Sequence, residues 1–176
     1  MSDFARVRPS WIFPIPTTGL VATSADASVL AIRHRNYVDI WLQCVPGWDY
    51  EVTQSDESCV LRCRVQLKGD EFTTCVALAS AGDVLFVGSA RGLRAFQLTS
   101  IRSKDDAATI TPISLPKQLT RSVLAVAMSN DGSRLAVGCA FGSILLCDVT
   151  NGVSVVGQLP FATDIEVKGD VNCLHR

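Results

Sequence analysis

Residues 124–147 carry the sequence LAVAMSNDGSRLAVGCAFGSILLC. The stretch contains three short apolar runs, Leu124–Met128, Leu135–Val137 and Ile144–Cys147, separated by small and polar residues. The segment Asn130-Asp131-Gly132 favours a tight turn, because glycine adopts a positive φ at little cost. The pattern predicts three consecutive antiparallel strands joined by short turns.

The same pattern occurs twice more, nearer the N-terminus. Residues 29–41 and 84–96 each contain two apolar runs around a small or polar turn, and both align with residues 134–147. Two sets of aligned positions recur every 50 to 55 residues: Leu30, Leu85 and Leu135, and Trp41, Phe96 and Cys147. A further apolar strand is expected before each hairpin, and a fourth after it at 59–67, 110–115 and 153–159.

Four strands in each repeat of about 50 residues are typical of β-propeller blades. The sequence therefore predicts an all-β, WD-type propeller of about three blades, at 19–67, 72–115 and 122–160. The pair Cys147-Asp148 occupies the place of the WD dipeptide, but the Gly-His pair and the hairpin Asp of a strict WD blade are absent, which indicates a divergent propeller. Single outlying strands are expected at 11–15 and 171–174.

Three blades do not close a ring, because closed propellers need roughly four to eight. The first and last blades are therefore expected to expose apolar faces, and the missing blades to come from another segment of a longer parent or from another chain. Expressed alone, residues 1–176 are expected to be insoluble or oligomeric.

The composition is that of a folded chain, with 48% hydrophobic and 19% charged residues. The net charge of -1 gives no overall attraction to nucleic acid or to anionic membranes. No apolar run reaches the roughly 18 residues of a membrane-spanning helix, and the N-terminus has no signal-peptide core. Seven cysteines without regular spacing indicate reduced thiols in a cytosolic or nuclear protein.

Motifs for catalysis and cofactor binding are absent from the sequence. There is no Gly-x-Ser-x-Gly elbow, phosphate loop or dinucleotide fingerprint, and the only histidines are His34 and His175. Cys59 and Cys63 are expected on one strand face with Leu61, Val65 and Leu67, which favours buried structural thiols over a zinc site. We therefore expect a non-enzyme with no cofactor, metal or small-molecule substrate.

Candidate partner contacts lie in the predicted turns and insertions. Arg33, His34 and Arg35 form a basic hairpin tip that suits RNA phosphate, although a solvated turn is the favoured interpretation. Trp48, in an insertion at 46–58, is either an interface anchor or a side chain packed over the blade edge. A second insertion at 99–109 contains Arg102 and Lys104, and it is expected to be mobile or ordered by a partner because its residues 104–108 have little to bury.

Four stretches, taken in order, resemble the cirhin family of WD-repeat subunits of the small-subunit processome, in its later propeller: Val38–Trp41, Phe72–Ala77, Leu93–Leu98 and Ser122–Leu135. Each stretch is generic for propellers, so the order of two insertions among three blades is the specific part. The resemblance spans roughly residues 29–148, and this chain is far shorter than the family's proteins.

The resemblance implies a non-catalytic scaffold in the nucleolus that supports pre-18S rRNA processing and small-subunit assembly. Its partners would be other protein subunits of a large ribonucleoprotein, with indirect or weak contact to pre-rRNA and none to membranes. The alternative is a WD-repeat scaffold of another assembly, such as a ubiquitin-ligase receptor or a trafficking complex. A propeller hydrolase would need clustered acids or a metal at the central channel.

Overall fold

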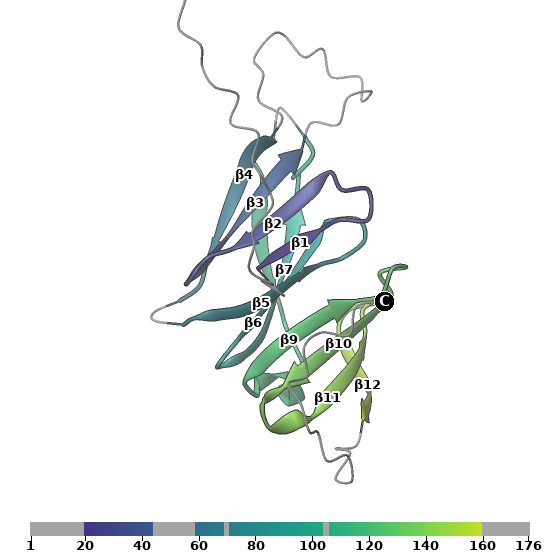
Figure 1. The fold of residues 1–176 in the computed structure, drawn as a ribbon. Helices are drawn as coiled ribbons and strands as arrows, with labels where there is room; N and C mark the ends of the chain where they lie inside the picture. Colours follow the sequence, from purple (N-terminus) through teal and green to yellow (C-terminus); the bar gives the residue numbers. More distant parts are fainter. Residues whose placement is uncertain (1–19, 44–58, 69–70, 104–105, 160–176) are drawn as a thin grey trace, which may run out of the picture.

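The computed structural model describes residues 20–43, 59–68, 71–103 and 106–159. These residues form three four-stranded antiparallel sheets, each with its strands in sequence order, arranged as neighbouring blades (Figure 1). Helix within the described ranges is limited to two 3-10 turns, η1 (Lys117–Thr120) and η2 (Ala140–Gly142). The expected all-β fold of about three blades is confirmed, whereas the strands expected at 11–15 and 171–174 lie outside the described residues.

The twelve strands follow the predicted order, with ends shifted by a few residues. The first sheet contains β1 (Val21–Thr23), β2 (Val29–Arg33), β3 (Tyr37–Gln43) and β4 (Cys59–Gln66). The second contains β5 (Thr73–Leu78), β6 (Val84–Ser89), β7 (Gly92–Thr99) and β8 (Thr109–Ile113). The third contains β9 (Val123–Met128), β10 (Arg134–Cys139), β11 (Ile144–Asp148) and β12 (Ser154–Leu159).

The aligned positions of the three repeats are paired directly across the hairpins. The register joins Leu30 to Trp41, Leu85 to Phe96 and Leu135 to Cys147. Because side chains alternate between the two faces of a strand, one fixed pair determines which face every other residue of the hairpin occupies. The repeat in the sequence is therefore a repeat of sheet register.

The inner strands of the three sheets lie side by side, because β5 contacts both β1 and β9. Between the first and second sheets lies the first core, where Ile40 and Leu85 are fully buried. Between the second and third sheets lies the second core, where Phe86, Leu135 and Val137 are at most 1% exposed. The second sheet is thus covered on both faces and holds the other two together.

The outermost faces of the first and third sheets have no neighbouring sheet among the described residues. Leu85 and Leu135 each face the preceding sheet and are fully buried, as expected for residues between blades. Leu30 has the same register position but is only half-buried. Leu30, which the repeat pattern aligns with Leu85 and Leu135, therefore does not line a core between two described sheets, because no described sheet precedes its own.

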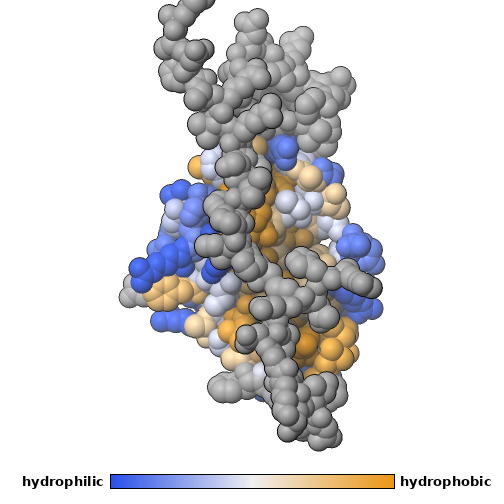
Figure 2. Space-filling view, in the orientation of Figure 1, coloured by the Kyte–Doolittle hydropathy of each residue, from blue (hydrophilic) through white to orange (hydrophobic). Residues whose placement is uncertain are grey.

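The free face of the third sheet exposes several large apolar side chains, and hydrophobic residues gather over this sheet in Figure 2. The exposed fractions are 59% for Leu124, 54% for Val156, 46% for Leu159 and 39% for Ile144. Between them lie the small residues of β9 and β10, including Ala127 and Ala136. We call this surface the outer face of the third sheet.

A β-bulge in β4 changes which face of the sheet its side chains occupy. The register shifts between Ile40 and Trp41, so Cys63 pairs with Ile40 while Leu61 pairs with Trp41. Cys63 packs against the first core, whereas Leu61 is 43% exposed. The prediction that residues 59, 61, 63, 65 and 67 share one face is therefore wrong, because a bulge inserts one residue and moves the following side chains to the other face.

Candidate interaction surfaces

Every strand runs between two opposite ends of the three neighbouring sheets, which we call the hairpin end and the turn end. The hairpin end contains the β2–β3, β6–β7 and β10–β11 connections, and the turn end contains the β1–β2, β5–β6 and β9–β10 turns. At the hairpin end, the Thr73 amide donates to the Arg35 carbonyl at 2.9 Å, and the Thr74 hydroxyl donates to the Val123 carbonyl at 2.6 Å. These bonds join all three sheets into one surface.

The three residues of the basic hairpin tip, Arg33, His34 and Arg35, have different surroundings. Arg33 is half-buried and donates to the Thr73 carbonyl, and burial lowers the pKa of its guanidinium. The His34 ring stacks on Tyr37 at 4.3 Å between centroids. Arg35 is exposed, with its guanidinium 4.4 Å from the centroid of the Phe72 ring. Only Arg35 therefore presents its charge fully to solvent.

Asp39 is a buried carboxylate that the sequence analysis did not select. It is 5% exposed and accepts two hydrogen bonds from Arg64, at 2.7 and 3.0 Å. The hydrogen bond with Asp39 raises the pKa of Arg64, whose guanidinium also lies 4.1 Å from the centroid of Tyr37. His34 Nε2 lies 3.3 Å from the same carboxylate. The charge of Asp39 is thus satisfied within the first sheet.

Glu71 has the corresponding role beside the second sheet. It is 3% exposed, accepts a hydrogen bond from the Ser89 hydroxyl, and lies 3.3 Å from Arg94 Nη2. The residues of the strict WD network are missing from the sequence, and this Glu-Ser-Arg cluster provides a polar network of its own. Its members are 18 and 23 residues apart, so spacing alone gave no signal for it.

Positive charge gathers at the hairpin end. Among the described residues, this end has eight cationic side chains and two buried carboxylates, Asp39 and Glu71, so positive charges exceed negative charges by six. The eight cationic residues are Arg33, Arg35, Arg64, Lys68, Arg91, Arg94, Lys117 and Arg121. Five of them are exposed and have no carboxylate partner within the described ranges: Arg35, Lys68, Arg91, Lys117 and Arg121. The near-zero net charge of the whole chain conceals this concentration.

A groove opens beside these cations, between the end of β4 and the outer strands of the second sheet. Its volume is about 490 Å³, and its lining includes Lys68, Arg94, Phe96, Leu115 and Thr120. This volume falls in the range of small-ligand sites. Glu71 also lines the groove and pairs with Arg94, so Lys68 is the cationic side chain of the lining that has no carboxylate partner among the described residues. This lysine beside an apolar wall suits an amphipathic anionic group.

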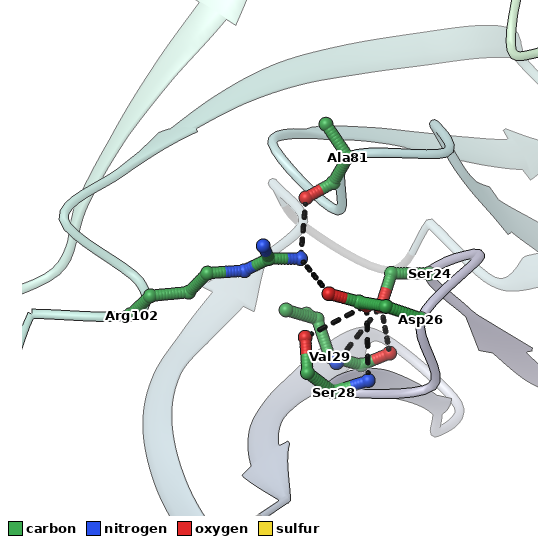
Figure 3. A network of polar contacts seen from close by, with 6 residues as sticks. All are labelled: Ser24, Asp26, Ser28, Val29, Ala81 and Arg102. Atoms are coloured by element: carbon green, nitrogen blue, oxygen red, sulfur yellow. Dashed lines mark hydrogen bonds and ion pairs between the residues drawn. The ribbon is translucent and has the colours of Figure 1, made fainter. Parts of the chain in front are cut away.

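The turn end has the opposite character, and its centre is Asp26 (Figure 3). The Asp26 carboxylate accepts hydrogen bonds from the Ser24 hydroxyl at 2.6 Å and from the Ser28 hydroxyl at 2.8 Å. Arg102 lies in the connection between β7 and β8 of the second sheet and places Nη2 3.0 Å from Asp26 Oδ2 and 2.9 Å from the Ala81 carbonyl. The network therefore links the first two sheets.

The insertion containing Arg102 is anchored to the rest of the chain. Ile101 is 5% exposed in the first core, and Arg62 Nη2 donates to the carbonyls of Ser100, Ser103 and Asp106. Residues 100–103 therefore make contacts within the chain, whereas the mobility expected for the insertion as a whole stays a prediction. Arg102, expected as a partner contact, makes contacts within the chain; Trp48 and Lys104 lie outside the described residues.

The ionised Asp26 carboxylate links the first two sheets, so we expect the stability that it contributes to be lost in acid. Burial raises the pKa of Asp26, but hydrogen bonds from Ser24 and Ser28 and the charge of Arg102 outweigh this and lower it from 3.8 to about 2. A lowered folded-state pKa stabilises the fold above the unfolded pKa, and this contribution is lost as the pH falls from about 4 to about 2. Asp26→Asn should therefore lower the urea midpoint near neutral pH and have a much smaller effect near pH 2.

Asp83→Asn is the matched control, because Asp83 is exposed in the equivalent turn of the second sheet and its carboxylate accepts no hydrogen bond among the described residues. An equal difference between wild type and Asp26→Asn at both pH values would contradict the role assigned to the carboxylate charge.

Comparison with known proteins places the chain by fold. No known protein family and no curated protein matches the sequence. Among 358 similar solved chains is one from the structure titled "Crystal Structure of Mitotic Checkpoint Complex", with a TM-score of 0.54 and 16% identity. The match covers 81% of this chain and 38% of that one, so this chain spans well under half the length of its solved neighbour. The likeness shows a partial β-propeller fold.

The described residues offer neither a cluster of metal ligands nor a membrane-spanning helix. No group of three or more His, Cys, Asp or Glu side chains there could hold a metal ion, and no helix there is long and apolar enough to cross a membrane. Cys63, Cys75, Cys139 and Cys147 are free thiols, and burial raises the pKa of Cys63, Cys75 and Cys147.

Proposed function

We propose that this chain is a non-catalytic scaffold subunit of the nucleolar small-subunit processome, where it supports pre-18S rRNA processing and small-subunit assembly. The scaffold role rests on one observation above all, the outer face of the third sheet. Exposed apolar side chains as large as Leu124 and Ile144 on one sheet face are typical of a surface that another protein covers. The similar solved chain also belongs to a complex, which supports a role in assembly.

The choice of assembly rests on the resemblance to the cirhin family. Two of its stretches, Val38–Trp41 and Leu93–Leu98, lie in β3 and β7. Both strands are followed by long connections, at 44–58 and 100–108, whereas the third sheet joins β11 to β12 through only residues 149–153. The order of two long insertions followed by a short connection supports the proposal.

Affinity purification of the tagged full-length protein from its own cells tests the proposal. The processome role predicts that U3 small nucleolar RNA and other processome subunits co-purify with it. Ubiquitin-ligase or coat subunits, recovered without U3, would overturn the processome role and support the alternative scaffold. Loss of all protein neighbours would overturn both.

A paired variant connects the result to the structure. Leu124→Asp with Ile144→Asp places two charges on the outer face of the third sheet, where a covering protein would have to desolvate them. We expect this variant to lose its neighbours. The control is Thr111→Asp, an exposed substitution on the outer strand β8, which should retain them.

A further inference from the structure

The hairpin end gathers cations that are far apart in the sequence. Arg35 lies in the β2–β3 turn, Arg91 in the β6–β7 turn and Arg121 directly before β9, so each sheet supplies one exposed arginine. The positions are neighbours because the Thr73 amide bonds to the Arg35 carbonyl and the Gly92 backbone packs closely on Thr120. The cations thus form a track across three blades.

The turn end shows that this positive charge is a local property. Five described carboxylates lie there with three arginines, Arg62, Arg102 and Arg134: Asp26, Asp83, Asp106, Asp131 and Asp148. Arg102 and Arg134 are engaged with Asp26 and Asp148. A molecule with one positive and one negative end orients an approaching anionic ligand toward the positive end.

An exposed aromatic ring lies within the cationic track. Phe72 is 46% exposed, and Arg35 covers part of it. Nucleic-acid bases stack on aromatic rings and on guanidinium planes, while their phosphates pair with arginine. An acidic peptide would use the charges but has no comparable need for a flat ring, so the ring favours nucleic acid over an acidic protein segment.

We propose that the hairpin end binds single-stranded nucleic acid. Arg35, Arg91 and Arg121 contact successive phosphates, a base stacks on Phe72, and the adjoining groove at Lys68 accepts a neighbouring nucleotide. An unpaired strand is required because stacking on Phe72 needs a base whose face is free. This inference goes beyond the scaffold role, because it assigns a direct ligand to one surface and holds for any parent assembly.

Fluorescence anisotropy with a labelled 20-nucleotide probe tests the inference, using the soluble oligomeric fraction of the full chain, prepared in the same way for all variants. Oligouridine and oligodeoxythymidine probes of equal length show whether the surface binds RNA or DNA more tightly. For sequence-independent binding we expect a Kd of roughly 10⁻⁴ to 10⁻⁶ M at physiological salt. Arg91→Gln with Arg121→Gln should weaken binding on the order of tenfold and reduce the salt slope by about 1.4.

The matched control removes two positive charges from the turn end, Arg102→Gln with Arg134→Gln, and melting curves confirm that each variant is folded. This control should bind within about twofold of wild type. Phe72→Leu should weaken binding to either nucleic acid at least about fivefold. It should leave binding to polyglutamate unchanged, because polyglutamate has no base to stack.

Three results would overturn the inference: equal losses in the hairpin-end and turn-end variants, no effect of Phe72→Leu, or polyglutamate that binds more tightly than the nucleic acids. The last result would identify an acidic protein segment as the ligand. Failure of U3 RNA to co-purify would remove the processome role while leaving these measurements intact. Conversely, U3 co-purification without direct binding here would overturn this inference alone.

Discussion

Replacing Leu135 with alanine is expected to lower the free energy of unfolding by about 2–5 kcal/mol. Leu135 is fully buried in the second core, where it lies with Phe86 and Val137 between the second and third sheets. The loss combines the transfer free energy of the removed methyl groups with the cost of the cavity left between two sheets that cannot both relax. Urea or thermal unfolding measures it, with the substitution made in the Leu124→Asp, Ile144→Asp background, which keeps the second core intact and is expected to be more soluble.

Leu30→Ala is the matched control for this prediction, because Leu30 has the same register position in the first sheet. Its face has no neighbouring sheet among the described residues, and Leu30 is only half-buried. We expect Leu30→Ala to cost about 1 kcal/mol, from the smaller apolar area and the absence of a closed cavity. A cost below about 1 kcal/mol for Leu135→Ala itself would show that Leu135 is not buried between sheets.

The hairpins could be predicted from sequence because their signals are local. Alternating apolar residues around a short turn fix the register, and the pairing of Leu85 with Phe96 follows from that pattern. The bulge beside Trp41 could not be predicted, since it depends on how β3 and β4 fit together rather than on either strand alone. The exposure of Leu61 is the direct result.

The candidate nucleic-acid surface could be predicted only in part. The run Arg33, His34 and Arg35 is visible because its charges are consecutive, yet only Arg35 proved to be an exposed cation. Arg91 and Arg121 are single cations among neutral neighbours, and the fold alone brings them to the same end. One signal was present in the sequence: Asp39 interrupts an apolar strand, and a lone carboxylate in such a place usually has a buried partner.

Expressed without partners, residues 1–176 are expected to be insoluble or oligomeric. The outer face of the third sheet exposes Leu124, Val156, Leu159 and Ile144 on one blade. In the second core the corresponding side of the second sheet, including Phe86 and Ala95, is buried against the third sheet. A face of this kind left in water drives association, because covering it removes apolar area at roughly 25 cal/mol per Å².

Analytical ultracentrifugation and calorimetry of the purified chain measure this outcome. Leu124→Asp with Ile144→Asp should increase the soluble monomeric fraction, since both side chains are exposed and their replacement leaves the second core intact. Thr111→Asp, which adds a charge away from that face, should not. A monodisperse wild-type monomer that melts cooperatively would contradict the prediction and indicate that the chain covers its own faces, as in a compact ring of about four blades.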